Sequence, residues 1–171
     1  MDRLHFACHV RLNGTKAYVV WYQDDRSGFV RQPDGRLLVA GSFASLVASA
    51  ATQGISLTPG YVTDYDFDRL SEWCRQPNSE GIDCSTFLNA WNFFDDLAEV
   101  DDKPDTPFSR LSREAGGIYD KLFWGNNLAA VTPPGQEFVP TWTADELQDL
   151  GRVLGCGIAL IEAELRGESS W

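Results

Sequence analysis

The alternation of apolar and polar residues predicts strands in the first part of the chain. Residues 4–12 alternate with the two-residue period of a half-buried strand. Asn13-Gly14 follows, and this pair predicts a tight hairpin turn because both residues tolerate a positive φ. Residues 17–22 are β-branched and aromatic, as strands prefer. Turns rich in Asp, Gly and Pro then separate extended pieces at 28–31 and 36–40. The pattern predicts an antiparallel meander of about four strands.

Helical periodicity dominates from about residue 64 onward. A first helix is already expected earlier, at 43–53, with Ser42 as its N-cap. Further helices are expected at 67–74, 84–100 and 108–115, and in a long segment that begins at 144. Asp83 is a candidate N-cap, and Thr143 with Glu146 has the spacing of a capping box.

The segments between these helices carry signals of their own. A short extended piece is expected at 61–65, and Gly116-Gly117 is expected to end a helix. Residues 125–141, rich in Asn, Gly and Pro, predict a long irregular loop. In the last helix, Gly151, Gly155 and Gly157 lower the helix propensity, and we expect the close approach of a neighbouring element to compensate.

These elements predict an α+β fold, in which an N-terminal antiparallel β-meander packs against C-terminal helices. The length fits a single domain spanning residues 1–171. Within it, residues 1–63 are expected to form mainly strands with one helix, and residues 64–171 to be mainly helical.

The charge of the chain is unevenly distributed. The net charge is −11, and residues 64–105 alone contribute −9, with twelve acidic against three basic residues. Such a field repels nucleic acid and anionic membranes and attracts cationic partners. No apolar run approaches the ~20 residues of a membrane span. The N-terminus, residues 1–5, lacks the long apolar region of a signal peptide. The sequence therefore indicates a cytoplasmic protein that binds neither membranes nor nucleic acid. Its four dispersed cysteines are expected to be reduced thiols.

No catalytic motif accompanies this charge, and we predict no catalytic residue, metal or cofactor. Asp95-Asp96-Leu97-Ala98-Glu99 is similar to the metal motif of isoprenoid synthases. Those enzymes are all-helical, longer, and carry a second such motif. The remaining interpretations of these carboxylates are a solvated helix face and a partner-binding face. His5 and His9 would lie ~13 Å apart on one strand face, too far to share a metal ion, and are interpreted as ordinary strand residues.

Two segments combine aromatic residues with Asn and Asp. They are Leu88–Asp96 and Tyr119–Asn127. Asn126 and Asn127 are interpreted either as turn residues or as recognition residues. Trp91 and Trp124 are candidate anchors for a partner, on the condition that they are exposed.

These segments also carry a family resemblance. Together with Tyr65–Asp68, Asp83-Cys84 and Thr132-Pro133, they look like parts of small bacterial proteins. The size and acidity of the chain are similar to those of cytoplasmic immunity proteins that neutralise toxins. The resemblance implies an inhibitor that binds a protein partner.

The expected function is therefore that of an acidic cytoplasmic binding protein that neutralises a basic partner, such as a nuclease-type toxin domain. The residues expected to bind that partner are Asp95, Asp96, Glu99, Asp101, Asp102, Asp105, Trp91, Trp124, Asn126 and Asn127. Two alternatives remain open, namely a small enzyme whose site combines distant carboxylates and aromatics, and a structural or oligomeric subunit. The oligomeric state is not determined by the sequence.

Overall fold

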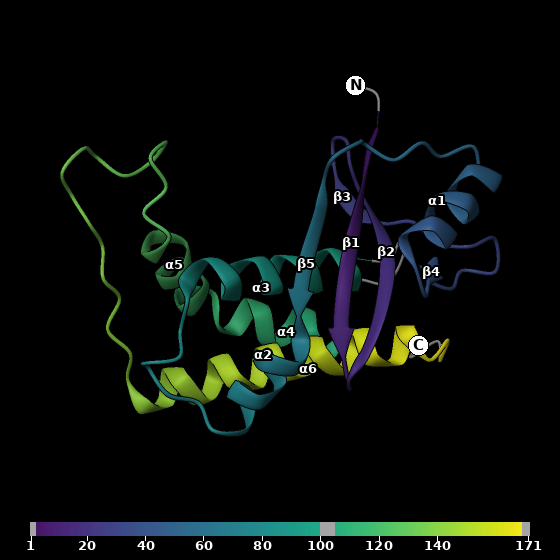
Figure 1. The fold of residues 1–171 in the computed structure, drawn as a ribbon. Helices are drawn as coiled ribbons and strands as arrows, with labels where there is room; N and C mark the ends of the chain where they lie inside the picture. The colour runs from purple at the N-terminus through teal and green to yellow at the C-terminus, as the bar shows by residue number, and fades with distance from the viewer. Residues whose placement is uncertain (1–2, 100–104, 169–171) are drawn as a thin grey trace. The chain divides into compact units, whose positions relative to one another are not determined.

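The computed structural model describes residues 3–99 and 105–168 and confirms an α+β fold (Figure 1). The strands are β1 (Leu4–Leu12), β2 (Thr15–Gln23), β3 (Ser27–Phe29), β4 (Val39–Ala40) and β5 (Val62–Asp66). The helices are α1 (Phe43–Thr52), α2 (Phe67–Arg75), α3 (Cys84–Ala98), α4 (Pro107–Glu114), α5 (Gly116–Gly125) and α6 (Ala144–Leu165). The chain forms two compact units: unit 1, residues 1–69 and 159–171, and unit 2, residues 70–158.

The hairpin of β1 and β2 forms as the sequence predicts, with φ of 53° at Asn13 and 69° at Gly14. The order of the remaining strands differs from a simple meander. Both β3 and β4 pair with β2 and lie along the edge that β1 leaves free, so β4 does not extend the sheet beyond β3. Between them the chain leaves that edge through a tight turn, in which the Gln32 N–H donates to the Arg36 carbonyl at 2.7 Å.

The extended piece near residues 61–65 joins the same sheet as β5. It pairs parallel to β1, with Val10 opposite Tyr65, so the sheet is mixed. A parallel pair needs a long crossover connection, and the segment that contains α1 supplies it. Ser42 caps α1 by accepting the Ser45 N–H, as expected. Buried α1 residues pack on the sheet in a cluster formed by Ala7, Val20, Val30, Leu38, Ala40, Leu46 and Ala50.

In unit 2, α3 is the most deeply buried helix. Its buried residues are Phe87, Leu88, Ala90, Trp91, Phe93, Phe94, Leu97 and Ala98. Asp83 caps it by accepting the Thr86 N–H at 3.1 Å, which confirms the predicted start. Gly157 of α6 lies against α3 so closely that an added Cβ would meet the Phe94 ring at 2.1 Å. This confirms the expected close approach at Gly157, whereas nothing lies within 4 Å of the equivalent position at Gly155.

The helix predicted at 108–115 ends as expected, since α4 stops at Glu114 and Ala115 is its C-cap. The helix that follows was not predicted, because Gly116-Gly117 begins α5. The first N–H groups of a helix need no partner within the helix, so glycine is less disruptive there than in the middle. Burial of Ile118 and Leu122 stabilises the helix that follows. The irregular loop after α5 and the capping box at Thr143 form as predicted.

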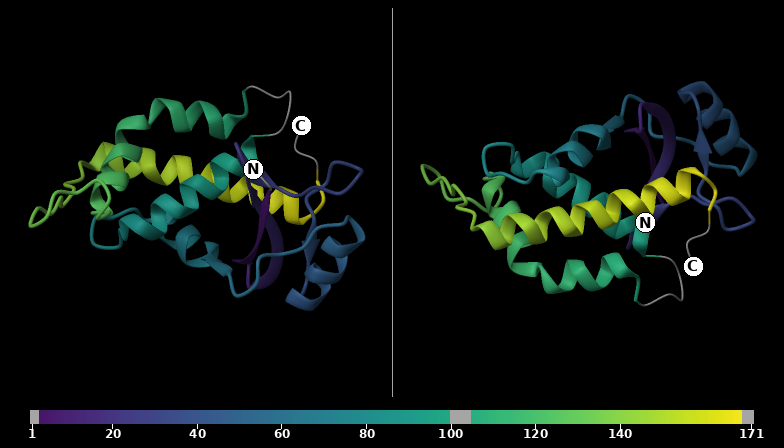
Figure 2. Two further views of the ribbon diagram at one scale, coloured as in Figure 1. Left: turned by 90° about the horizontal axis from the view of Figure 1, so that it is seen from above. Right: turned by 90° about the horizontal axis from the view of Figure 1, so that it is seen from below.

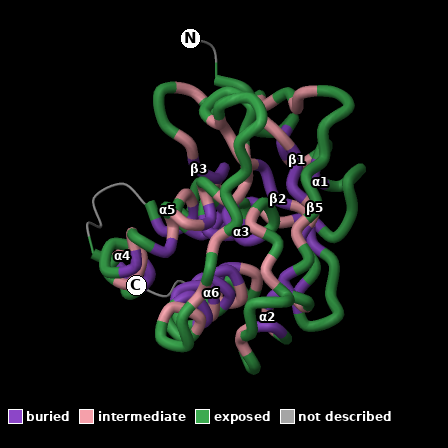
Figure 3. Tube along the Cα trace, turned by 90° about the vertical axis from the view of Figure 1, so that its left-hand side faces the viewer, coloured by how far each residue is buried: buried purple, intermediate pink, exposed green. Residues whose placement is uncertain are grey.

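Burial follows this arrangement within each unit. Figure 2 shows α6 as one continuous helix in the view from below. Figure 3 shows buried stretches along α3, α6 and the central strands, whereas the connecting loops are mostly exposed. All four cysteines are free thiols. In the part of the chain that the structure describes, no helix combines the length and the hydrophobicity that crossing a bilayer requires.

Candidate functional site

Three of the predicted partner-binding carboxylates lie at the C-terminal end of α3. Asp95 and Glu99 are exposed and one helical turn apart, and Asp96 lies beside them. The carboxyl end of a helix carries the negative end of its dipole, so carboxylates are unfavourable there. The last turn of α3 contains no basic residue. Asp101 and Asp102 lie outside the described residues.

The electrostatic effect of these carboxylates reaches α5. Partial desolvation, and after it the charge of Glu99, raises the pKa of the Asp95 carboxyl above its ordinary value. Tyr119 on α5 donates its hydroxyl to the Asn92 side-chain oxygen at 3.0 Å. The pKa of Tyr119 is also raised, first by desolvation and then by the charge of Asp95. Tyr119 on α5 therefore lies within reach of the negative charge at the end of α3.

The end of α3 keeps its negative charge because Asp95 and Glu99 have no basic partner among the described residues. No Arg or Lys lies within 4.0 Å of either carboxylate in the described ranges 3–99 and 105–168. Asp105 differs, because it pairs with Arg113 at 2.5 Å and with Arg110 at 3.9 Å. Its charge is compensated within the chain, so Asp105 does not belong with the unpaired carboxylates.

The two candidate tryptophans differ in exposure. Trp91 is 1% exposed and donates its ring N–H to the Ser112 hydroxyl at 2.9 Å. Trp91 is therefore not the exposed side chain that a surface anchor requires, because it lies on the buried, apolar side of α3. Trp124 is 44% exposed, on the last turn of α5, and meets that condition.

Asn127 has a structural role in a turn, which is one of the two interpretations that the sequence left open. It adopts a φ of 49°, and its side-chain NH2 donates to the carbonyls of Gly125 at 3.1 Å and Phe138 at 3.0 Å. Its side-chain oxygen accepts the Phe138 N–H at 2.7 Å. Both donor hydrogens are thereby used inside the loop. Asn126 ends α5, with its backbone N–H bonded to the Phe123 carbonyl.

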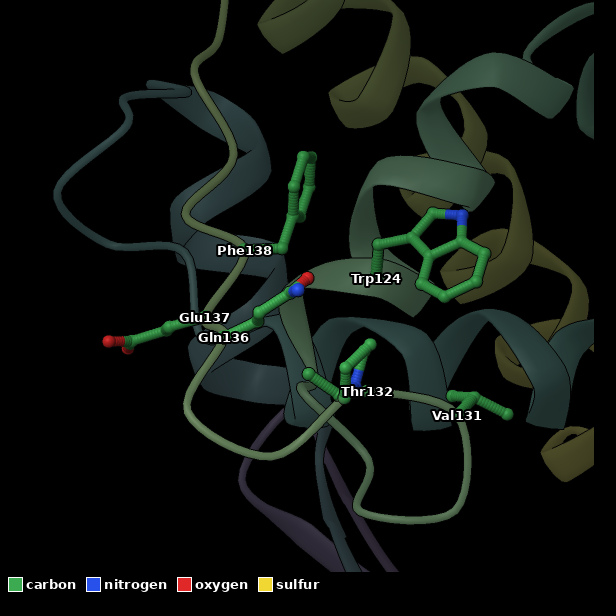
Figure 4. A pocket seen from close by; sticks show the side chains of 7 residues that line it. Trp124, Val131, Thr132, Gln136, Glu137 and Phe138 are labelled. Atoms are coloured by element: carbon green, nitrogen blue, oxygen red, sulfur yellow. The ribbon is translucent and has the colours of Figure 1, made fainter.

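A cavity next to this contact was not predicted from the sequence. It has a volume of about 260 Å³ and is lined by Trp124, Val131, Thr132, Pro133, Gln136, Glu137 and Phe138 (Figure 4). The signal that could have revealed it is the presence of Val131 and Phe138 inside a loop otherwise rich in turn residues. Both side chains are more than two-fifths exposed.

A further cluster of polar side chains lies on the sheet of unit 1 and consists of His9, Asp64 and Tyr18. His9 Nδ1 contacts an Asp64 carboxylate oxygen at 2.7 Å, and the His9 ring packs on Tyr18 at 4.8 Å between ring centroids. His9 Nε2 is buried without a hydrogen-bond partner. This arrangement follows from the register of β2, β1 and β5, which the sequence did not reveal. No three His, Cys, Asp or Glu residues among those described are grouped so that they could hold a metal ion.

Comparisons with known proteins do not assign the chain to a family. No protein-family model matches it, and no curated protein matches it. Among solved structures, the chain is similar to one described as the crystal structure of the SatS C-terminal domain in complex with bromine. The identity is 17%, the alignment covers 97% of this chain and 91% of that chain, and the TM-score is 0.43. At this identity and score, the likeness does not bear on function.

Proposed function

We propose that this chain is a binding protein that engages a basic protein partner through the acidic end of α3. The observation that carries the proposal is the pair of Asp95 and Glu99, which are exposed, four residues apart and without a basic neighbour among the described residues. Like charges one turn apart, at the negative end of a helix, destabilise the fold. A cationic partner would reverse that unfavourable contribution, because it would bring opposite charge to both carboxylates.

The field around this pair favours a cationic partner over long distances as well. Unit 2 contains fifteen acidic and six basic residues, for a net charge of −9. Such a field raises the rate at which a positively charged protein associates, and the effect weakens as salt shortens the Debye length from ~8 Å at physiological ionic strength. Charges of this kind act mainly on the association rate. They therefore favour a partner of opposite charge more than they determine the final affinity.

The partner that fits this surface best is a nuclease-type toxin domain, which the protein would neutralise in the cytoplasm as an immunity protein. A nuclease must present Lys and Arg to the phosphates of its substrate, so its active cleft is positively charged. A folded acidic surface can occupy such a cleft and exclude the substrate. The size and acidity of the chain, which are similar to those of bacterial immunity proteins, support this form of the proposal.

The test is charge reversal at the two unpaired carboxylates. Asp95→Lys with Glu99→Lys should slow association with a basic nuclease domain encoded next to the gene by about tenfold at low salt, since surface charges act on encounter rate. Stopped-flow or surface-plasmon kinetics would measure this, together with inhibition of DNA or RNA cleavage. The difference should shrink as salt is raised.

The matched control makes the same change of net charge elsewhere in unit 2. Glu72 and Glu80 are exposed and distant in sequence from the end of α3, and both can be replaced by Lys. If the two double variants slow association equally, only the overall charge matters and the α3 site is wrong. If neither variant changes association or inhibition, the proposal fails.

A further inference from the structure

The loop between α5 and α6, residues 126–143, exposes more apolar surface than its turn-rich composition suggests. Four of its side chains and one on the last turn of α5 are exposed by 43–71%, namely Trp124, Leu128, Val131, Phe138 and Val139. In Figure 1 this loop is the long green segment that follows α5. Exposed apolar residues gathered on one segment are typical of a binding surface.

The chain holds this loop in a defined shape. Asn127 pairs with both the N–H and the carbonyl of Phe138, as a neighbouring strand would. Two further backbone bonds tighten the turns inside it, from the Thr132 N–H to the Leu128 carbonyl at 2.9 Å and from the Gln136 N–H to the Pro133 carbonyl at 3.1 Å. A cavity built on such a loop is largely preformed, so less conformational entropy is lost when it is filled.

The walls of the cavity determine what it can accept. Trp124 and Phe138 provide two aromatic rings, and Val131 and Pro133 provide aliphatic surface (Figure 4). Glu137 is at the rim with its carboxylate directed away from Trp124 (Figure 4). The sequence contains no Lys, Arg or His from residue 122 to residue 151. The site therefore offers no positive charge to an anion, and one negative charge to an approaching cation.

An arginine side chain fits these walls better than a lysine side chain. Its planar guanidinium stacks on aromatic faces and is less strongly hydrated than an ammonium group, and its three-carbon stem packs on aliphatic surface. Lysine offers a compact, strongly hydrated charge instead. At about 260 Å³ the cavity is smaller than the ~300–1,000 Å³ typical of sites for drug-sized ligands, which suits a single side chain.

From these walls and this charge pattern we infer that the cavity formed by Trp124, Val131, Pro133 and Phe138 receives an arginine side chain of the basic partner. The inference rests on the proposed function, because the arginine belongs to the same partner that the α3 carboxylates attract. The two sites have different tasks. Asp95 and Glu99 govern the rate of encounter, whereas the arginine in the aromatic cavity slows dissociation, as aromatic and arginine hot spots do.

The experiment uses a probe that isolates the side chain from the rest of the partner. The isotope-labelled full chain is titrated with Nα-acetyl-L-arginine N-methylamide, and the NMR signals of the Trp124 indole and the Phe138 amide are followed. Nα-acetyl-L-citrulline N-methylamide, which has nearly the same shape but no charge, is the matched probe. Saturable shifts at these two signals are expected with arginine, and binding of the citrulline probe should be about tenfold weaker, in keeping with a partly desolvated cation–π contact.

Variants test the cavity itself. Phe138→Ala and Trp124→Ala should each weaken binding of the arginine probe by about tenfold or more. Val139→Ala is the matched control, because Val139 lies on the same loop, is 71% exposed and does not line the cavity. It should leave probe binding unchanged. Trp124→Leu, which keeps an apolar side chain, guards against a loss of fold and should weaken binding as Trp124→Ala does.

Four outcomes would overturn the inference. Equal affinity for arginine and citrulline would make the cavity a general apolar site, and absence of saturation would exclude a site. Shifts at the Asp95 and Glu99 amides that match those at Trp124 would indicate diffuse charge attraction. Shifts of the Trp124 and Phe138 signals with protein concentration alone would make a second copy of the chain the occupant. If charge reversal at Asp95 and Glu99 did not slow association while the arginine probe still bound, the proposed function would be rejected, but the arginine site in the cavity would remain.

Discussion

Units 1 and 2 differ in net charge and in how far their charged residues are paired. Unit 1 has ten acidic and eight basic residues, for a net charge of −2, against −9 for unit 2. Its arginines join elements distant in sequence, in pairs that include Arg3–Asp24, Arg11–Asp66 and Arg31–Glu164. Among the described residues of unit 2, Asp95 and Glu99 at the end of α3 make no such pairs. The comparison indicates that these arginines serve the fold in unit 1, whereas the carboxylates at the end of α3 remain available at the surface of unit 2.

Arg31 and Glu164 show the structural use most clearly. Arg31 donates two hydrogen bonds to the Glu164 carboxylate, at 3.1 and 3.0 Å, and a third to the Gly35 carbonyl at 3.0 Å. The Glu164 side chain is only 6% exposed. The pair therefore connects α6 to the turn between β3 and β4, with the Glu164 side chain almost fully covered and the Arg31 side chain 20% exposed.

Breaking that pair is the largest effect we expect. Glu164→Gln keeps the shape of the side chain but leaves Arg31 without its counter-charge, and breaking a largely buried pair on one side costs up to about 3 kcal/mol. Urea unfolding followed by circular dichroism measures the loss. Arg31→Met with Glu164→Leu should recover most of it. Asp34→Asn, which breaks the exposed pair with Arg36, should change stability by less than about 1 kcal/mol. A similar loss in both single variants would remove the distinction.

A second prediction examines whether apolar packing, rather than ion pairs, stabilises unit 2. Gly157→Ala places a Cβ 2.1 Å from a carbon of the Phe94 ring and should destabilise the protein by about 1–3 kcal/mol. Gly155→Ala meets nothing within 4 Å and should stabilise it by up to about 1 kcal/mol, because alanine favours helix. Calorimetric unfolding of the two variants compares them directly. If they behave alike, the contact between α6 and α3 does not limit packing.

A third prediction concerns charge that does serve the fold of unit 2, at the start of α6. The Thr143 side chain accepts the Glu146 N–H at 3.2 Å, and Glu146 accepts both the Thr143 N–H at 2.9 Å and Lys121 Nζ at 2.5 Å. Thr143→Ala should cost about 1 kcal/mol, measured by urea unfolding. Thr141→Ala is the control, since only the backbone carbonyl of Thr141 takes part, accepting a bond from Lys121. Equal losses in the two variants would contradict the role of the cap.

The smallest effect has the opposite sign. Asp95→Asn should stabilise the protein at neutral pH by about 0.5 kcal/mol, because it removes a charge from the negative end of a helix and from beside Glu99. The folded-state pKa of Asp95 is raised, so the penalty exists only while the carboxyl is ionised. The advantage of the Asp95→Asn variant should therefore fade as pH drops through that raised pKa, and vanish below the unfolded value of ~3.9.

The same measurement, thermal unfolding across pH 3–7, gives the control. Asp105 is paired with Arg113, so Asp105→Asn should destabilise the protein slightly, by less than about 1 kcal/mol. Two substitutions of identical chemistry would then have opposite signs. Loss of stability in both variants would mean that Asp95 is also a structural charge.

Local features of the fold could be predicted from the sequence, because they depend on neighbouring residues. Three such features lie at their predicted positions, namely the turn at Asn13-Gly14, the Asp83 N-cap and the Thr143–Glu146 capping box. The parallel pairing of β5 with β1 could not be predicted, since it joins residues more than fifty positions apart. The start of α5 was missed because Gly116-Gly117 is also a common way to end a helix.

The candidate site shows the same division. The acidic composition of residues 95–105 is visible in the sequence, but which carboxylates are compensated depends on tertiary contacts, as Asp105 demonstrates. Trp91 lies on the apolar stripe of α3, so helical periodicity alone argued for its burial. The cavity beside Trp124 depends on how Asn127 closes an irregular loop, and no periodic pattern encodes that contact.

The order of synthesis determines when the pair between Arg31 and Glu164 can form. Glu164 follows Arg31 by 133 positions, so a ribosome completes all of unit 2 before the counter-charge of Arg31 exists. Until then Arg31, in the turn between β3 and β4, lacks the Glu164 carboxylate with which it pairs. Unit 2 is continuous in the chain, whereas unit 1 gains its second segment only after unit 2 has been synthesised.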